Sequence, residues 1–218
     1  MLQSILVVLV DFDGTIVNVD TAELVLQRFA DGDWATFDQQ LERGAITLEE
    51  CVRKQFSLVK ASENEILSEL DRAVTLRPNF EKLVALCKRQ GFPIAIVSAG
   101  LDFCLRHILL GNPLFKEIEL DIPKAQCTSD GMKFTSFPKL RYSDSHNFKD
   151  DLVRYYQRQG SKVAYLGDAL IDYHAVKNAD LPFAVKGSDL ADACDRDGVP
   201  YTPFTDFSDV IAAINQAD

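Results

Sequence analysis

The chain has 218 residues, of which 47% are hydrophobic, and its formal net charge is −10. This length can bury a sizeable core, enough for one domain with an insertion. Nucleic-acid binding requires a basic face that displaces counterions, and this acidic sequence shows none, so we expect no nucleic-acid partner. An anionic substrate would need cations gathered locally against the overall charge.

Membrane and disulfide roles are also disfavoured. The apolar run at residues 4–10 is too short to span a bilayer, and no other run is longer. The five cysteines are scattered without a Cys-x-x-Cys pair, which favours reduced core thiols over a disulfide framework or a zinc site. We therefore expect a cytoplasmic protein with no membrane partner.

The first predicted element is a strand at residues 4–10, apolar on both faces, as in a parallel sheet covered by helices. From about residue 20 to residue 73 the pattern predicts successive helices with no strand between them. Capping pairs begin three of these helices: Asp20 with Glu23, Thr47 with Glu50, and Ser62 with Glu65. A helical block of this length between two strands is typical of an inserted domain.

Alternation of helices and strands resumes at residue 78. The predicted helices span 79–91, 101–111, 147–160, 169–179 and 206–216, the strands 93–98, 115–121, 162–168 and 182–185, and a hairpin 126–135. This order predicts an α/β fold, with an open Rossmann-like parallel sheet that has helices on both faces. The predicted core comprises residues 1–16 and 76–218, and residues 17–75 form an inserted helical cap.

Two aspartates follow the first strand at once. Side chains alternate along a strand, so Asp11 and Asp13 can point the same way, and Gly14 lets the backbone turn tightly and lets a ligand approach. Ligands of open parallel sheets bind beyond the carboxyl ends of the strands, where these acids are expected. The alternative is an ordinary Asp-Gly turn, which occurs elsewhere in this chain.

Two other predicted strands also end in polar residues that can bind an anion or a metal ion. Ser98, Ala99 and Gly100 follow the strand 93–98 and offer a hydroxyl and backbone N–H groups to an anion, although Ser98 alone is also a common helix cap. Asp168 ends the strand 162–168, and Asp172 follows one helical turn later. A turn residue and a solvated helix face are the alternatives for these two acids.

Converging carboxylates need a cation. Two unit charges about 4 Å apart in a partly shielded site repel by roughly 4 kcal/mol. A hard divalent ion with oxygen ligands relieves this repulsion, and Mg²⁺ binds through a few carboxylates together with substrate phosphate. Mg²⁺ and a lysine would also let a carboxylate attack a phosphate dianion, which splits hydrolysis into two steps.

Four segments in this order resemble the haloacid dehalogenase superfamily. They are DFDGT at 11–15, VSAG at 97–100, a lysine near the start of the helix 147–160, and GDALID at 167–172. The resemblance covers nearly the whole chain, and the combination is far more specific than any one segment. It implies a magnesium-dependent phosphatase that acts through an aspartyl phosphate on a small phosphorylated metabolite.

The resemblance also implies a role for each matching residue. Asp11 would be the nucleophile, and Asp13 would protonate the leaving alkoxide and then activate water. The presence of Asp13 favours a phosphatase over the dehalogenases and ion-pumping ATPases of the superfamily, which typically lack the second aspartate. The implied phosphate-binding residues are Ser98, Ala99, Gly100 and Lys149, the metal ligands are Asp11, the backbone carbonyl of Asp13, and Asp168, and the supporting residues are Thr15 and Asp172.

Two assignments stay open in the sequence. Lys139 is a rival to Lys149, but it precedes no clear helix, and Lys149 is better spaced from 167–172. The helical block resembles the cap of the phosphoserine-phosphatase-like branch, in which an acid and an arginine bind the amino acid part of the substrate. Asp20 stands at the position of that acid, unless it is only a helix cap, and Gln55 stands at the position of the arginine. A neutral amide in place of a bidentate clamp disfavours phosphoserine.

Within this branch, segments 41–52 and 167–185 most resemble the methionine-salvage phosphatases that act on 2-hydroxy-3-keto-5-methylthiopentenyl-1-phosphate. The chain departs from that group at 142–148, where bacterial members often have a cysteine-rich run. The alternatives are a phosphoserine phosphatase and, in a different class, a non-catalytic phosphoacceptor of the receiver type. Receiver modules are shorter and lack a helical insertion. We expect a monomer or a homodimer.

Overall fold

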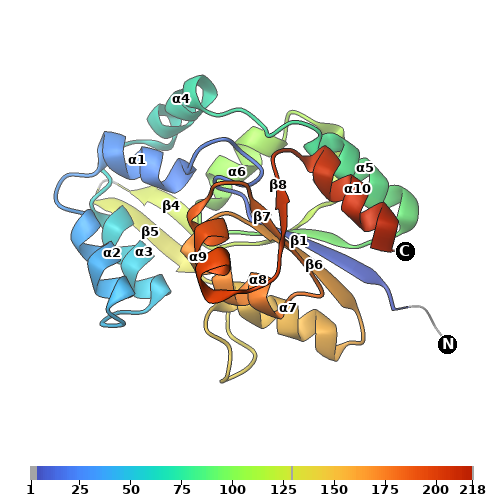
Figure 1. Cartoon of the computed structure of the whole chain (residues 1–218). Coiled ribbons are helices and arrows are strands. Elements are labelled where there is room, and N and C mark those ends of the chain that lie inside the picture. Colours follow the sequence, from blue (N-terminus) through green and yellow to red (C-terminus); the bar gives the residue numbers. More distant parts are fainter. Residues whose placement is uncertain (1–3, 129, 218) are drawn as a thin grey trace.

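The computed structural model describes residues 4–128 and 130–217. Within these residues, six parallel strands form the main sheet in the order β3-β2-β1-β6-β7-β8 (Figure 1). The strands are β1 (Leu6–Val10), β2 (Ile94–Val97), β3 (Glu119–Asp121), β6 (Lys162–Gly167), β7 (Leu181–Val185) and β8 (Thr202–Phe204). The predicted open parallel α/β sheet is confirmed.

β1 lies in the middle of the sheet because its side chains are apolar on both faces. All five of its residues are buried, and Val8 pairs with Ile94 of β2 on one side and with Ala164 of β6 on the other. One hydrophobic cluster contains Val8 and a second contains Leu9, since successive side chains point to opposite faces. The residues that follow β1 therefore leave the sheet at its centre.

Helices cover both faces of the sheet (Figure 1). The helices α5 (Phe80–Gln90), α6 (Asp102–Leu109) and α10 (Phe207–Ala217) contribute to the cluster that contains Val8. The helices α7 (Phe148–Arg158), α8 (Tyr173–Asn178) and α9 (Asp189–Asp197) contribute to the cluster that contains Leu9. This arrangement leaves the carboxyl edge of the sheet for a ligand.

Four helices separate β1 from α5 along the chain: α1 (Thr21–Phe29), α2 (Ala35–Glu42), α3 (Leu48–Ser57) and α4 (Glu63–Ala73). The predicted capping boxes of Thr47 with Glu50 and of Ser62 with Glu65 are present. These reciprocal hydrogen bonds satisfy N–H groups that a helix start leaves free, so α3 and α4 begin where the sequence predicts.

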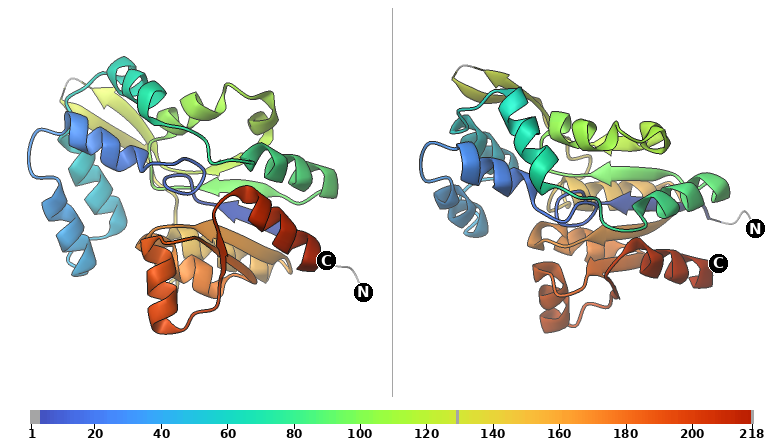
Figure 2. Two further views of the ribbon diagram at one scale, coloured as in Figure 1. Left: turned by 45° about the horizontal axis from the view of Figure 1, so that its top comes forward. Right: turned by 90° about the horizontal axis from the view of Figure 1, so that it is seen from above.

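Three of these helices, α1, α3 and α4, share a hydrophobic cluster with a hairpin from the second half of the chain. β4 (Lys124–Thr128) and β5 (Gly131–Ser136) pair antiparallel, and α3 packs against β5. The cluster joins Phe56 of α3 to Met132 and Phe134 of β5. Both views in Figure 2 place these helices and the hairpin at the same end of the sheet, the end toward which β1 points.

The sequence patterns predict no element between residues 186 and 205, where the structure has α9 and β8. Ser188 caps α9 by accepting a hydrogen bond from the N–H of Ala191, and Gly198 ends the helix with a φ of 67°. β8 has three residues, two of them exposed, so its pattern carries no strand signal. Short turns of 3₁₀ helix add η1 (Pro113–Glu117) and η2 (Leu170–Asp172), the second beginning the predicted helix 169–179.

The cysteines form no disulfide within the described residues. Burial raises the pKa of Cys51, where Asp38 adds to the effect, and of Cys87 to about 12 in each case. Such thiols stay protonated and unreactive at neutral pH. Among the described helices, none is both long enough and apolar enough to cross a membrane.

Candidate active site

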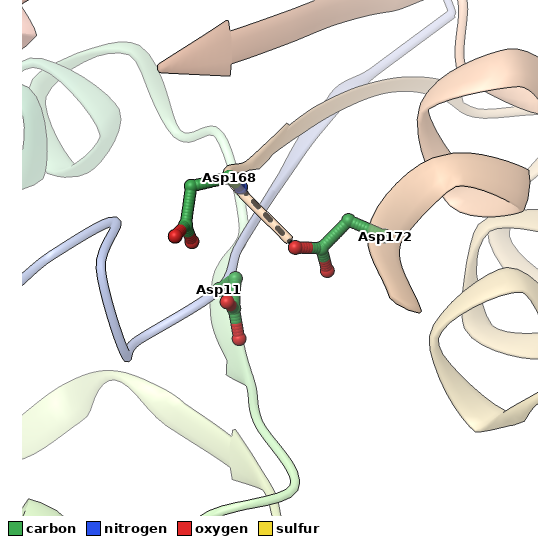
Figure 3. Close-up of side chains that lie close together, drawn as sticks. All are labelled: Asp11, Asp168 and Asp172. Atoms are coloured by element: carbon green, nitrogen blue, oxygen red, sulfur yellow. Dashed lines mark hydrogen bonds between the residues drawn. The ribbon is translucent and has the colours of Figure 1, made fainter. Parts of the chain in front are cut away.

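Three strand ends meet at the carboxyl edge of the sheet. Asp11 directly follows β1, Ser98 follows β2, and Asp168 follows β6. The backbone N–H of Asp11 donates to the carbonyl of Leu166, which continues the pairing of β1 with β6 and fixes the direction of the Asp11 side chain. Figure 3 shows the carboxylates of Asp11, Asp168 and Asp172 gathered around one space.

A buried lysine joins two of these acids. The Nζ of Lys149 lies 2.8 Å from Oδ1 of Asp11 and 2.7 Å from Oδ1 of Asp172, and its side chain is only 2% exposed. Asn147 caps α7 by accepting from the N–H groups of Lys149 and Asp150, and so fixes the helix start that carries the lysine. The rival Lys139 is exposed and lies outside any helix or strand. The structure therefore brings Lys149, not Lys139, to the acids.

Asp172 is held from several directions. Its carboxylate accepts hydrogen bonds from Lys149 and from the Oη of Tyr165, each at 2.7 Å, and from the N–H groups of Asp168 and Ala169, each at 3.2 Å. Asp172 is fully buried, so the alternative of a solvated helix face is wrong. No sequence motif singles out Tyr165, although a tyrosine hydroxyl inside a buried strand needs a polar partner.

Asp13 lies apart from this lysine-linked group. Its Oδ1 accepts from the N–H of Thr21 at 2.8 Å and from the hydroxyl of Thr21 at 2.5 Å, and its Oδ2 lies 3.3 Å from the Oγ of Ser98. Ser98 is buried, and its Oγ accepts from the N–H of Gly100 at 2.9 Å, so the segment of Ser98, Ala99 and Gly100 turns directly beside Asp13. Asp13 thus faces the predicted phosphate-binding segment.

The turn after β1 is fitted tightly against Asp168. Gly14 has a φ of +69°, and a Cβ at this position would clash with the carboxylate of Asp168, so only glycine fits. Thr15 is buried and donates from its Oγ1 to Oδ1 of Asp168 at 2.7 Å. The guanidinium of Arg77 donates to the carbonyls of Gly14 and Thr15 and also to that of Thr205. No sequence motif identifies Arg77.

The acids at this edge hold their protons unusually tightly. Burial and the charge of Asp172 raise the pKa of Asp11 well above its usual range. Burial, with smaller contributions from neighbouring acids, raises the pKa of Asp13 to about 7 and that of Asp168 to about 6. Burial alone would lower the pKa of Lys149, but Asp11 and Asp172 outweigh it and raise that pKa. The positive charge of one lysine therefore does not balance the negative charges of these carboxylates.

The donor set fits a hard divalent cation. Carboxylate oxygens of Asp11, Asp168 and Asp172 all lie within 4.8 Å of one another. These ligands are oxygen atoms, which Mg²⁺ prefers, and the excess of buried negative charge is what a divalent ion would neutralise. Since Lys149 and Tyr165 already occupy Oδ1 of Asp172, the ligands left for the ion are the carboxylates of Asp11 and Asp168.

These raised pKa values predict how stability depends on pH without a metal. In the unfolded chain the carboxyls of Asp13 and Asp168 titrate near 3.8, so between about pH 4 and pH 7 the folded protein binds more protons than the unfolded chain. The contribution of each group to the free energy of unfolding therefore falls as pH rises through this window. Asp168→Asn removes one such group, and its melting temperature should rise relative to the wild type by roughly 5 °C between pH 5 and pH 8.

The measurement is thermal unfolding of both chelated proteins at each pH. A constant difference between the two melting temperatures would contradict the raised pKa of Asp168. Addition of Mg²⁺ at pH 8, where the carboxyl of Asp168 is already deprotonated, should raise the melting temperature of the wild type and not that of Asp168→Asn, because the ion binds only the folded site and requires this carboxylate.

The two predicted cap residues lie on α1 and α3. Asp20 is exposed and accepts from the N–H of Glu23, which makes it the N-cap of α1. Gln55 is 6% exposed, and its Nε2 donates to Oδ1 of Asp38 at 2.8 Å and to the carbonyl of Trp34 at 3.4 Å. The amide of Gln55 is therefore held by residues of the helical block and not by the catalytic candidates.

Comparison with known proteins places the chain in a family. The model of the haloacid dehalogenase-like hydrolases matches residues 8–177. A 2-hydroxy-3-keto-5-methylthiopentenyl-1-phosphate phosphatase of Geobacillus kaustophilus is 30% identical over 218 residues, covering 98% of this chain and 97% of that protein. The chain belongs to the haloacid dehalogenase-like hydrolase family.

A second similar sequence and a solved structure also belong to proteins named as phosphatases. The protein of the same name from Brevibacillus brevis is 30% identical over 219 residues, covering 97% of this chain and 96% of its own. A phosphoserine phosphatase solved as a phospho-aspartyl intermediate analogue superposes with a TM-score of 0.61 and 21% identity, covering 87% of this chain and 90% of that one. The similarity to the named phosphatases supports the predicted enzyme class, a phosphatase of the haloacid dehalogenase-like family. The superposition with the solved structure shows the shared fold.

Proposed function

We propose that the protein is a magnesium-dependent phosphomonoesterase that forms an aspartyl phosphate on Asp11. The observation that carries this proposal is the setting of Asp11, whose buried carboxylate is bound by Lys149 while Asp13 lies beside the Ser98 segment. A nucleophilic carboxylate needs a nearby cation, and an alkoxide leaving group needs a nearby acid. Both are present within this one site.

Each residue would then perform one task. The carboxylate of Asp11 attacks phosphorus, the bond from phosphorus to the leaving oxygen breaks, and Asp13 donates its proton to that oxygen. Asp13 next takes a proton from the water that attacks the aspartyl phosphate, which releases phosphate and restores Asp11. Ser98, the N–H group of Ala99, and Lys149 would hold the phosphoryl oxygens, and the N–H of Gly100, which donates to the Oγ of Ser98, would fix that hydroxyl.

The carboxylates of Asp11 and Asp168 and the backbone carbonyl of Asp13 would hold Mg²⁺. When bound, the ion supplies positive charge that reduces the repulsion between the attacking carboxylate and the phosphoryl group. Thr15 would fix the carboxylate of Asp168, and Asp172 would fix Lys149. The raised pKa values of Asp11 and Asp168 support this assignment, since a cation would favour their charged forms.

Residues 17–75 would form a cap over a core of residues 1–16 and 76–218. The two chain segments that join these parts lie side by side, with a bridge between Val17 and Leu76 and a hydrogen bond from the N–H of Asn18 to the carbonyl of Thr75. Two adjacent connections of this kind would let the cap rotate relative to the core about a hinge. A closed cap would exclude water and select the leaving group.

The proposed substrate is 2-hydroxy-3-keto-5-methylthiopentenyl-1-phosphate, in cytoplasmic methionine salvage. The support is the identity of about 30% over almost the whole chain to proteins that carry this name. The neutral and internally bonded Gln55 supports it further, because phosphoserine carries a carboxylate that needs a cationic partner. The other proposed role of the cap, recognition of an amino group by Asp20, has no such support, since Asp20 caps α1.

Phosphate release from a panel of phosphorylated metabolites tests the function. With Mg²⁺ present, we expect the keto-bearing thiopentenyl phosphate to have the highest kcat/KM, and phosphoserine to be at least about tenfold poorer, the equivalent of one lost charge-assisted bond. Chelation should abolish all turnover. Preferential hydrolysis of phosphoserine would contradict the proposed substrate, and turnover that survives exhaustive chelation would contradict the metal assignment.

A further inference from the structure

The two carboxylate oxygens of Asp13 have different surroundings. Oδ1 accepts two hydrogen bonds from one residue, Thr21, with its N–H at 2.8 Å and its hydroxyl at 2.5 Å. Oδ2 has only a long contact of 3.3 Å with the Oγ of Ser98. Oδ1 is therefore anchored, and Oδ2 is held weakly.

This difference determines which oxygen carries a proton. A carboxylic acid has its proton on one oxygen, and an oxygen that already accepts two hydrogen bonds has no lone pair well placed for it. A proton on Asp13 therefore belongs on Oδ2. A Cβ built on Gly100 would lie 2.7 Å from Oδ2, so this oxygen is on the side of the segment that follows β2. The anchored oxygen faces α1, and the proton-carrying oxygen faces the proposed phosphoryl site.

We propose that Thr21 is a positioning residue that anchors Oδ1 of Asp13, so that Oδ2 presents the proton to the leaving oxygen. This inference rests on the proposed function of Asp13 and adds a residue for which neither the sequence motifs nor the family match gives a role. Thr21 touches neither of the proposed metal-binding carboxylates in the described structure, and it acts through Asp13 alone.

The local structure explains why the N–H and the hydroxyl of Thr21 are both available to bond Asp13. Thr21 is the first residue of α1, where backbone N–H groups lack partners within the helix. The side chain of the N-cap, Asp20, accepts from Glu23, which leaves the N–H of Thr21 for Asp13. Thr21 is 1% exposed, so water does not compete for its hydroxyl.

The position of Thr21 in the chain has a further consequence. Thr21 lies four residues after Val17, where the chain leaves the core through the bridge to Leu76. A movement of α1 relative to the sheet would withdraw both donors from Asp13 together. The proton donor is then aligned only while α1 is seated against the core, which links the acid to the proposed cap.

Thr21→Val tests the inference because it removes the hydroxyl and keeps the shape and the backbone N–H. Thr21→Ser restores the hydroxyl. The matched control is Thr36→Val, since Thr36 also donates both its N–H and its hydroxyl to one aspartate, Asp33, elsewhere in the helical block, there to its two different carboxylate oxygens. Each variant is assayed for kcat/KM on two substrates, the best alkyl phosphate of the panel and p-nitrophenyl phosphate, whose leaving group departs without a proton donor.

We expect Thr21→Val to slow alkyl phosphate hydrolysis by about 10- to 100-fold, a part of the full contribution of general acid catalysis. Its kcat/KM on p-nitrophenyl phosphate should change by less than about threefold, because no proton transfer to the leaving group is needed. Thr21→Ser and Thr36→Val should behave like the wild type on both substrates.

An equal loss on both substrates, or no loss on either, would overturn the role of Thr21 while the proposed function stands. A failure of Thr21→Ser to restore the alkyl phosphate rate would overturn it as well. Absence of wild-type turnover on every phosphate ester would instead overturn the proposed function, and the role of Thr21 with it.

Discussion

Asp11→Asn should abolish phosphate release and leave the fold intact. An amide is a poor nucleophile, and removal of a covalent nucleophile lowers kcat by a factor on the order of 10⁴ or more. The fold should persist because asparagine has nearly the same shape, and because burial and the charge of Asp172, which raise the pKa of Asp11, make its negative charge unfavourable in the folded protein. The measurements are phosphate release from the best substrate of the panel and the thermal unfolding temperature.

The matched control for this variant is Asp121→Asn. Asp121 ends β3 at the same edge of the sheet, and burial raises its pKa too, but the described structure gives it no contact with Lys149 or Asp172. This control should keep wild-type turnover. More than a few per cent of activity in clean Asp11→Asn protein would contradict nucleophilic catalysis by Asp11.

Lys149→Met should have the second large effect, on activity and stability together. It removes the positive charge that lies between Asp11 and Asp172, and loss of one partner from a buried ion pair destabilises by about 3–5 kcal/mol. Because Lys149 favours the charged form of Asp11, its loss should raise the pKa of Asp11 further, and the destabilisation should be smaller at pH 5 than at pH 8. Turnover should fall by a factor on the order of 10² to 10³.

Lys139→Met distinguishes the two lysines of the sequence hypothesis. Lys139 is exposed and lies outside any helix or strand, so this variant should match the wild type in turnover and in thermal unfolding at both pH values. Loss of activity in Lys139→Met with retention in Lys149→Met would contradict the assignment of Lys149 to the phosphoryl site.

The parts of the site that follow from the sequence are those fixed by local patterns. The apolar run of β1 predicts a central strand, so the residues after it must lie at the carboxyl edge of the sheet. Asp11 and Asp168 are brought together for this reason, since β1 and β6 are neighbours. The capping boxes of α3 and α4 likewise depend on residues three positions apart, and both are present.

The residues that sequence reasoning misses are defined by distant contacts. Arg77 follows the helical block, yet its guanidinium binds carbonyls of Gly14, Thr15 and Thr205, which no local pattern encodes. Tyr165 reads as an apolar strand residue, and its hydroxyl bond to Asp172 depends on how η2 folds back over β6. Such contacts require the tertiary placement of the turns, because hydrophobic periodicity reports only which face is buried.

Chemical trapping of the covalent intermediate tests the central claim most directly. The variant Asp13→Asn should still be phosphorylated by p-nitrophenyl phosphate, which needs no proton donor, but should lose the base that activates water, so the intermediate accumulates. Quenching with acid and reduction with borohydride converts an aspartyl phosphate to homoserine, which peptide mass spectrometry locates. We predict homoserine at position 11, formed only when both Mg²⁺ and the phosphate ester are present. Unmodified Asp11 in protein that releases p-nitrophenol, or homoserine at another aspartate, would contradict the account.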